Sequence, residues 1–366
     1  MSRAPENGPR EAGHQAPETR TCPVLPAHRF DEAALARWLG GRLPGAAEGF
    51  ALRQFQGGQS NPTFLLTCRG GQRYVLRKKP PGELLPKAHQ VEREYRVMAA
   101  LAPTPVPVPG MRLLCEDPGP IGTAFYVMDY VEGRIAADPA APDLSPEQRR
   151  PSRLAMVETL ARLHAVDWRA VGLAGFGRPE GYVERQVSRW SRQYEASRQG
   201  GGLPDMDRLA AWLSARVPAE QETAIAHGDY RVGNLVLHAE EPRIVAVLDW
   251  ELATLGHPVA DLAYFCMPYH LPAGVPGVRG LQGLDLAALG IPGEEEILAA
   301  YCEHSGRPAL PHWRFFLAFS LFRLAAILQG VAARAALGNA SNADAREVGS
   351  RAGLLAAAGR RIAEGT

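Results

Sequence analysis

One short loop constrains the fold of this chain more than any other segment. The stretch His227-Gly228-Asp229-Tyr230-Arg231-Val232-Gly233-Asn234 carries a carboxylate and, five residues later, an amide. Two apolar runs beside it, Asn234–His238 and Arg243–Leu248, predict short strands. Asp249 follows the second run directly, so a further carboxylate is expected at the mouth of a buried strand. We therefore predict that these three side chains belong to one site.

The spacing H-x-D-x-x-x-x-N is typical of the catalytic loop of phosphoryl-transfer enzymes. In that chemistry a carboxylate accepts a hydrogen bond from the acceptor hydroxyl, and an amide oxygen about one turn later binds Mg²⁺. We predict that Asp229 is the base or orienting group, and that Asn234 and Asp249 are the metal ligands. Two protein ligands suffice because Mg²⁺ also binds phosphate oxygens and water. An ordinary turn at the loop and a helix N-cap at Asp249 are the alternatives.

The charge balance narrows the classes of partner. Among 366 residues, Lys+Arg number 40 and Asp+Glu 39, for a net charge of +1. A general nucleic-acid binder carries a basic footprint that this balance lacks, so we expect no nucleic-acid partner. Lysine occurs only at Lys78, Lys79 and Lys87, so nearly all the basic residues are arginine. A site that needs a cation is therefore expected to use arginine.

Several features predict a cytoplasmic protein without a membrane partner. The five cysteines stand singly, which argues against a disulfide framework or a zinc site and favours a reducing compartment. Residues 1–26 lack the apolar core of a signal peptide. The most apolar stretch, Phe315–Val331, is interrupted by Arg323 and is predicted to be too short to span a bilayer.

The pattern along the chain predicts an α+β protein with two lobes. Residues 1–28 are predicted to be a disordered tail, and Asp31 is a candidate N-cap for a short helix. A small antiparallel sheet with one helix is expected over residues 29–130, and a larger, mainly helical lobe over residues 131–366. The elements expected in the first lobe are strands at Ala51–Gln56, Thr63–Cys68, Arg73–Lys78, Met111–Leu114 and Ala124–Tyr130, and a helix at Pro86–Leu101.

Further motifs carry a family resemblance. Leu248-Asp249-Trp250-Glu251, Gly256-His257-Pro258 and Asp261-Leu262-Ala263 follow the loop in order. Over roughly residues 30–362 the chain resembles the aminoglycoside phosphotransferase and choline kinase family, most closely the phosphotransferase domain associated with acyl-CoA dehydrogenases. The resemblance implies a protein-kinase-like two-lobed fold, ATP and Mg²⁺ as cofactors, and a functional link to an acyl-CoA dehydrogenase. Nucleotide preference and oligomeric state stay open.

The resemblance also implies a nucleotide site in the first lobe. The loop residues Gly57, Gly58, Ser60 and Asn61 would cover the phosphates, although a plain hairpin loop is the alternative. Arg77 falls where many members have the phosphate-binding lysine. Alternation along the strand puts Arg77 on the face opposite Lys78. Glu94 lies on the apolar stripe of the following helix, where it is either the partner of Arg77 or a surface acid.

The segment between the lobes resembles the hinge of the family. Backbone groups near Asp129 and Tyr130 would bind the adenine edge, and Met128 would be the gatekeeper. Apolar alternation alone indicates only a strand.

Four further polar residues are expected to have structural roles. We expect His227 to brace the catalytic loop and His164 to be a hydrogen-bonded core residue. Asp261 is expected to cap a helix or bond to the loop, and Arg323 to be structural.

The leading hypothesis is an ATP- and Mg²⁺-dependent phosphotransferase that acts on a small-molecule hydroxyl. Residues 262–366 contain 9 Arg and no Lys against 8 acidic residues, which suits a neutral or anionic acceptor better than a polycation. The resemblance points to a hydroxy acid or a hydroxyacyl-CoA. An aminoglycoside kinase and a catalytically silent ATP-binding scaffold are the alternatives. A protein kinase is disfavoured because no D-F-G or A-P-E motif follows Asp249.

Overall fold

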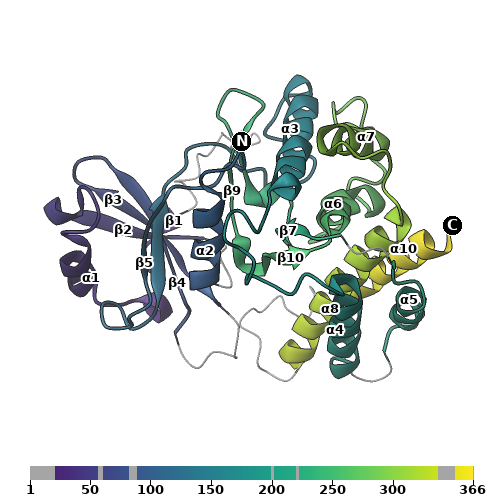
Figure 1. Cartoon of the computed structure of the whole chain (residues 1–366), viewed down its shortest axis with the longest axis horizontal. Helices are drawn as coiled ribbons and strands as arrows, with labels where there is room; N and C mark the ends of the chain where they lie inside the picture. The colour runs from purple at the N-terminus through teal and green to yellow at the C-terminus, as the bar shows by residue number, and fades with distance from the viewer. Residues whose placement is uncertain are drawn as a thin grey trace, which may run out of the picture.

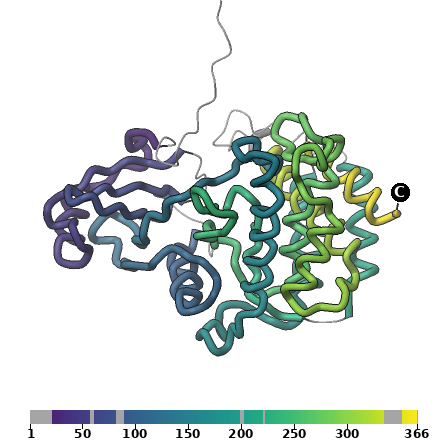
Figure 2. The backbone as a smooth tube through the Cα atoms, turned by 90° about the horizontal axis from the view of Figure 1, so that it is seen from above, coloured from purple at the N-terminus to yellow at the C-terminus, as the bar shows by residue number. Residues whose placement is uncertain are grey.

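The structure is a computed structural model, and it describes residues 21–56, 61–81, 89–198, 202–219, 222–336 and 351–365. Among these residues, a six-stranded antiparallel sheet and a mainly helical part lie next to each other (Figure 1). Seen from above, the sheet occupies one end of the molecule and the helices are gathered at the other (Figure 2). The predicted α+β fold with two lobes is confirmed.

The sheet has the strand order β1-β2-β3-β4-β6-β5. Most of its strands begin and end within one residue of the positions that alternation predicts. The strands are β1 (Thr21–Cys22), β2 (Phe50–Phe55), β3 (Thr63–Cys68), β4 (Arg73–Lys78), β5 (Met111–Cys115) and β6 (Phe125–Asp129).

The prediction of a disordered tail is wrong for residues 21–28, which form regular structure. Strand β1 pairs with β2, and a short 3-10 helix follows at Pro26–His28. The reason is Gln54, a buried side chain on β2. Its Oε1 accepts the N–H of Leu25 at 3.1 Å, and its Nε2 lies 2.7 Å from Nδ1 of His28. Burial of this amide therefore requires the incoming segment as its partner.

The two faces of the sheet pack against different helices. Tyr74 and Leu76 of β4 belong to the cluster that includes Leu35 of α1 (Glu32–Leu39), whereas Val75 joins the cluster that includes Met98 of α2 (Val91–Leu101). Helix α1 begins as predicted, because the Asp31 carboxylate accepts the N–H of Ala34. Because side chains alternate along a strand, Arg77 lies on the same face of β4 as Val75. This face puts Arg77 beside α2 and the second lobe.

The second lobe consists of helices around two small two-stranded sheets. Helix α8 is its centre, since it contacts α4, α5, α6 and α10. The helices are α3 (Pro146–Ala165), α4 (Tyr182–Ala196), α5 (Pro204–Ser214), α6 (Pro258–Cys266), α7 (Glu294–Ser305), α8 (Trp313–Ala336) and α10 (Ala352–Glu364). The strands are β7 (Ala224–Ala226), β8 (Leu235–Leu237), β9 (Ile244–Val247) and β10 (Thr254–Gly256).

Helix α8 contains an apolar window that extends beyond the stretch Phe315–Val331. Within the described residues, Trp313–Ala333 has the length and the mean hydropathy, 1.8, of a membrane span. The prediction that this stretch is too short is therefore wrong. In the structure 67% of the apolar window is buried inside the protein, and a core helix has the same composition.

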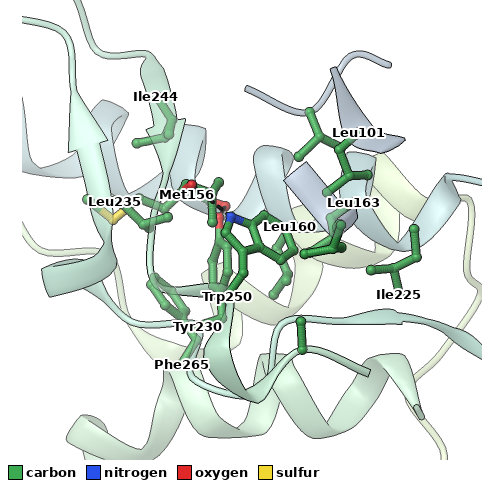
Figure 3. Packing of buried hydrophobic residues seen from close by; sticks show 14 of the residues in the cluster. Leu101, Met156, Leu160, Leu163, Ile225, Tyr230, Leu235, Ile244, Trp250 and Phe265 are labelled. Atoms are coloured by element: carbon green, nitrogen blue, oxygen red, sulfur yellow. Dashed lines mark hydrogen bonds between the residues drawn. The ribbon is translucent and has the colours of Figure 1, made fainter. Parts of the chain in front are cut away.

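One apolar cluster joins the two lobes beneath the predicted catalytic loop (Figure 3). It contains Leu101 from the first lobe together with Leu160 and Trp250 from the second. Two polar atoms inside it are satisfied by backbone carbonyls. The Trp250 indole donates to Val247 at 2.9 Å, and the Tyr230 hydroxyl donates to Met156 at 2.6 Å. These bonds fix the segments on either side of Asp229 and Asp249 in a close-packed environment.

Helix α6 begins at a buried histidine whose protonation should destabilise the fold. The Nδ1 atom of His257 accepts the N–H of Val259, and the ring stacks on Phe316 with centroids 4.4 Å apart. Burial lowers the pKa of His257 from 6.5 to about 4. The stability that comes from the neutral ring is therefore present above pH 6.5 and is lost as the pH falls toward 4.

We predict that acidification from pH 7 to pH 5 removes about 2 kcal/mol through this residue alone. The measurement is denaturant unfolding of the wild type and of His257→Asn, which keeps a capping acceptor but does not titrate. The wild type should lose more stability than the variant over this range. Equal losses in the two proteins would contradict the assignment.

Candidate active site

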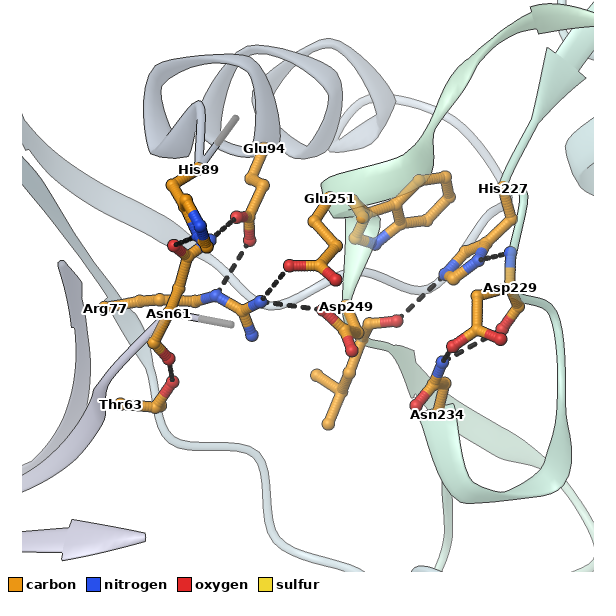
Figure 4. A network of polar contacts seen from close by, with 12 residues as sticks. Asn61, Thr63, Arg77, His89, Glu94, His227, Asp229, Asn234, Asp249 and Glu251 are labelled. Carbon is orange, nitrogen blue, oxygen red and sulfur yellow. Dashed lines mark hydrogen bonds and ion pairs between the residues drawn. The ribbon is translucent and has the colours of Figure 1, made fainter. Parts of the chain in front are cut away.

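The predicted catalytic carboxylate, Asp229, is held by donors from its own loop, of which Figure 4 shows Asn234. Nδ2 of Asn234 donates to Oδ2 of Asp229 at 2.8 Å, and also to the backbone oxygen of Asp229 at 2.9 Å. Nε of Arg231 lies 3.1 Å from the same Oδ2. The phenol of Tyr264 also interacts with this carboxylate, and burial first, then the charge of Asp229, raises the pKa of Tyr264. The carboxylate therefore has a fixed orientation.

His227 braces the loop, in agreement with its predicted role. Its Nδ1 accepts the N–H of Asp229 at 3.2 Å, so the proton belongs on Nε2, which donates to the backbone oxygen of Leu248 at 2.9 Å. The ring is fully buried. With both nitrogens engaged in the fold, His227 connects the loop to the residue that precedes Asp249.

Asp261 holds the start of the loop by its backbone. Its two carboxylate oxygens accept the N–H groups of His227 at 2.6 Å and of Gly228 at 2.9 Å. Nε2 of His164 lies 3.5 Å from the same carboxylate. Burial raises the pKa of Asp261, but the nearby imidazoles of His164 and His227 and the N–H of Gly228 outweigh it, so the net shift is downward. The prediction that Asp261 bonds to the loop is confirmed.

Gly228 and Arg323 complete this support. Gly228 has φ +82°, and a Cβ there would lie 2.6 Å from the backbone oxygen of Leu252, so only glycine fits without strain. Nη2 of Arg323 donates to the backbone oxygen of Gly228 at 2.7 Å, and its guanidinium lies over the rings of Trp190 and Tyr264. Arg323 is therefore structural, as predicted.

Arg77 lies at the meeting point of three carboxylates (Figure 4). Its Nε is 3.0 Å from Oε2 of Glu94, which confirms the predicted pair. Its Nη2 is 2.7 Å from Oδ1 of Asp249 and 3.4 Å from Oε2 of Glu251. The pair forms because β4 and α2 each turn one charged side chain toward the same buried space. Lys78 lies on the opposite face, near the ring of Phe30.

Glu94 is almost completely buried and receives two hydrogen bonds besides the ion pair. Nδ2 of Asn61 donates to its Oε1 at 2.7 Å, and the Tyr126 hydroxyl donates to its Oε2 at 3.0 Å. Register explains Tyr126, which lies directly opposite Arg77 in the β4–β6 ladder. Burial raises the pKa of Glu94, and Arg77 opposes that shift.

The side chain of Asn61 has a structural role that was not predicted. It is fully buried, with the amide nitrogen on Glu94 and Oδ1 3.1 Å from Nδ1 of His89. Asn61 therefore supports the Arg77–Glu94 pair, and binding of phosphate by its backbone N–H stays a prediction. The other residues of the predicted phosphate loop, Gly57, Gly58 and Ser60, lie outside the described residues.

Two backbone donors of the predicted hinge are used by the sheet. The N–H of Asp129 donates to Gly110 at 2.8 Å, and the N–H of Tyr130 donates to Arg73 at 3.2 Å. Binding of adenine by backbone groups near Asp129 and Tyr130 stays a prediction, which would use other groups than these two N–H donors. Among the described residues, the next N–H along the chain, that of Val131, donates to no backbone oxygen. Met128 lies opposite Val75 in the ladder, on the face that carries Arg77.

Asn234 and Asp249 are brought together by the hairpin of β8 and β9. The N–H of Leu248 donates to the backbone oxygen of Asn234 at 2.8 Å, and Leu235 pairs with Val247. Asp249 has φ +65°, a left-handed conformation that is uncommon for a residue other than glycine. One amide oxygen and one carboxylate fit Mg²⁺, which binds few protein ligands and completes its shell with phosphate and water.

Three residues of this site were not assigned roles from the sequence: Arg231, Tyr264 and Glu251. Arg231 and Glu251 stand inside the motifs themselves, so their positions could have suggested a role. Tyr264 comes from the helix that carries Asp261, three residues further on, and helical spacing places both toward the loop.

A cavity of about 530 Å³ opens beside the loop. Arg231 and Tyr264, which hold Asp229, form part of its wall. The rest of the described wall is largely apolar, and the charged residues in it are arginines: Arg153, Arg231, Arg279 and Arg351. The cavity thus adjoins the catalytic carboxylate.

Comparison with known proteins agrees with this geometry. The sequence pattern of the "Phosphotransferase enzyme family" matches residues 51–319. Mouse acyl-CoA dehydrogenase family member 10 is 46% identical over 334 residues, which cover 91% of this chain and 31% of that protein. Human acyl-CoA dehydrogenase family member 11 is 46% identical over 333 residues, covering 89% of this chain and 42% of that protein. The chain thus spans less than half the length of these curated relatives.

Solved structures show the same fold. A crystal structure from Ralstonia eutropha that carries the name of an aminoglycoside phosphotransferase superposes with a TM-score of 0.83 at 46% identity, covering 92% of this chain and 99% of that one. Choline kinase from Cryptosporidium parvum superposes with a TM-score of 0.63 at 12% identity, covering 92% and 97%, and shares the fold. With its catalytic loop, its Arg77–Glu94 pair and its matching sequence pattern, this chain belongs to the phosphotransferase enzyme family.

Proposed function

We propose that this protein is an ATP- and Mg²⁺-dependent phosphotransferase that transfers the γ-phosphoryl group to a hydroxyl of a small molecule. The observation that carries the proposal is the placement of Asp229 and Asn234 on one side of a site whose other side holds Asp249, Arg77 and Glu94. This arrangement supplies an acceptor-orienting carboxylate, a pair of metal-binding oxygens and a cation for phosphate.

Asp229 performs the proton chemistry in this proposal. Its carboxylate accepts a hydrogen bond from the acceptor hydroxyl and takes the proton as the new O–P bond forms and the bond to the leaving oxygen breaks. The carboxylate is kept in one orientation by Asn234, Arg231 and Tyr264. Little conformational entropy is therefore lost when it is ordered for the reaction.

Arg77 and the metal ligands handle the charge of the triphosphate. Arg77 is anchored through Nε to Glu94, and its planar fork leaves donors that suit phosphate oxygens. Asn234 and Asp249 would hold Mg²⁺. When bound, the ion supplies neutralisation of the charge on the phosphates.

The cavity beside the loop favours an anionic or neutral acceptor. Among the described residues that line it, the charged ones are arginines, with no acidic residue, and its wall is otherwise largely apolar. A polycationic aminoglycoside needs carboxylates for recognition, so a hydroxy acid or a hydroxyacyl-CoA fits better. The names of the curated relatives support a functional link to an acyl-CoA dehydrogenase. We also propose a cytoplasmic location without nucleic-acid or membrane partners.

An ADP-release screen tests the reaction. The purified protein would be incubated with Mg·ATP and with hydroxyacyl-CoAs, free hydroxy acids, amino alcohols and aminoglycosides. We expect ADP release with the acyl compounds. If only aminoglycosides are turned over and expression confers drug resistance, the aminoglycoside kinase replaces the kinase of acyl compounds as the preferred hypothesis. Binding of ATP with no ADP release across the whole panel would favour the silent scaffold.

Asp229→Asn should separate catalysis from nucleotide binding. The amide keeps the shape of the side chain but cannot take the proton, so we expect transfer to fall about 10²- to 10⁴-fold. The affinity for Mg·ATP should stay unchanged, because Asp229 is not a predicted metal ligand. Transfer rates and nucleotide titrations measure the two quantities, and full activity in the variant would contradict the role of Asp229.

Asp249→Asn should weaken nucleotide binding, and Glu251→Gln is its matched control. Both carboxylates contact Nη2 of Arg77, but only Asp249 is a predicted metal ligand. We expect the first variant to lose about tenfold or more in Mg·ATP affinity, which corresponds to about 1.4 kcal/mol, and the second to lose much less. Titrations at several Mg²⁺ concentrations measure this. Equal losses in both variants would show that Asp249 acts only through Arg77.

A further inference from the structure

The cavity beside the catalytic loop contains a buried cation. Arg153, on helix α3, lines this cavity and is only 3% exposed. One of its Nη atoms donates to the backbone oxygen of Pro139, and its guanidinium lies 5.6 Å from the centre of the Phe265 ring. No Asp or Glu of the described residues lies within ion-pair distance of it. Its charge is therefore not matched by a carboxylate.

Burial of this cation lowers the stability of the fold, and such a cost is retained where the cation serves a function. Arginine stays protonated in proteins, and the bond to Pro139 and the contact with Phe265 replace only part of the hydration that this buried guanidinium loses. Burial lowers the pKa of Arg153, and the groups that oppose this shift are Tyr269, Cys266 and Asp138. Other arginines of the protein differ, since Arg77 has three carboxylates, Arg150 pairs with Glu296, and Arg231 of the same cavity pairs with Asp229.

Arg153 is held at a fixed position relative to Asp229. The backbone oxygen of Met156, three residues along the same helix, accepts the Tyr230 hydroxyl at 2.6 Å. Tyr230 is the residue after Asp229, so α3 is attached directly to the catalytic loop. A ligand in the cavity would meet Arg231 and Tyr264 at the loop side and Arg153 from the helix side, with apolar wall such as Phe265 and Leu324 around it.

We propose that Arg153 is a specificity-determining residue that binds an anionic group of the acceptor while the acceptor hydroxyl lies at Asp229. The proposal rests on the proposed function, and it names the chemistry of the acceptor more closely: a hydroxyl and an anion joined by an apolar segment. A carboxylate and a phosphate share the required chemistry, because each accepts the fork of a guanidinium. The experiment has to distinguish these two sources.

The test uses three acceptors with one hydroxylated chain: the free carboxylate, its CoA thioester and its uncharged methyl ester. Transfer to each is measured for the wild type and for Arg153→Met, which keeps the length of the side chain and removes its charge. We expect the wild type to prefer a charged acceptor and the variant to lose that preference by about 10- to 100-fold in kcat/KM, mainly through KM. Loss confined to the free acid identifies a carboxylate, and loss confined to the thioester identifies the phosphates of CoA.

Arg279→Met is the matched control, because Arg279 lines the same cavity from an exposed position. We expect it to change the preference far less than Arg153→Met does. Equal effects would mean that the general positive charge of the cavity is responsible, and would overturn the assignment. So would an equal loss toward all three acceptors in Arg153→Met, since that result indicates a role only in holding the Pro139 segment.

Two further measurements keep the outcome decisive. Should Arg153→Met not fold, Arg153→Lys replaces it, and we expect this variant to keep the sign of the preference with a reduced size. Should the wild type transfer phosphate to none of the three acceptors, the proposed function fails for this class. Binding of the same compounds, measured by calorimetry with the wild type and the Arg153 variant, then still decides whether Arg153 binds the anion.

Discussion

The structure of the site depends on one buried carboxylate that accepts two consecutive backbone N–H groups. Asp261 receives them from His227 and Gly228 and so fixes the start of the catalytic loop to helix α6. The backbone there turns through a left-handed glycine, which a free loop would not keep. Because these bonds go to the main chain, this part of the loop is held without using the carboxylate of Asp229. Asp229 is therefore presented by a rigid support.

The two lobes are joined in different ways on the two sides of this loop. Beneath it, the apolar cluster around Trp250 is continuous from α2 to α3 and packs like the core of a single domain. Above it, the lobes meet through charges, since Arg77 of the sheet reaches Asp249 and Glu251 of the second lobe. Apolar packing is insensitive to ligands, whereas these ion pairs can be exchanged for contacts with phosphate. Adjustment on nucleotide binding is thus expected at Arg77.

Sequence patterns predicted the parts of the site that depend on local periodicity. Alternation along β4 and the helical stripe of α2, together with the family resemblance, predicted the pair of Arg77 with Glu94, and the spacing of the loop together with Asp249 predicted the Asp229 site. The patterns did not predict contacts that depend on long-range hydrogen bonds. The side chain of Asn61 bonds to Glu94 across 33 positions, and the N–H groups of Asp129 and Tyr130 are used by strands that only the folded sheet brings near. The sequence did not predict a role for Arg153, because its burial away from carboxylates results from the packing of the folded interior.

The charges around Arg77 also have a consequence for what can enter the site. In the described part of the chain, one guanidinium faces three carboxyl groups, so this region carries more negative than positive charge before any ligand binds. A bare triphosphate would be repelled by that excess, whereas a triphosphate that arrives with its counter-cation brings the missing positive charge. In the proposed function, this arrangement would favour entry of the metal complex of a nucleotide over entry of the free polyanion. The same three acids that hold Arg77 in place would thus couple the entry of metal and nucleotide into a single event.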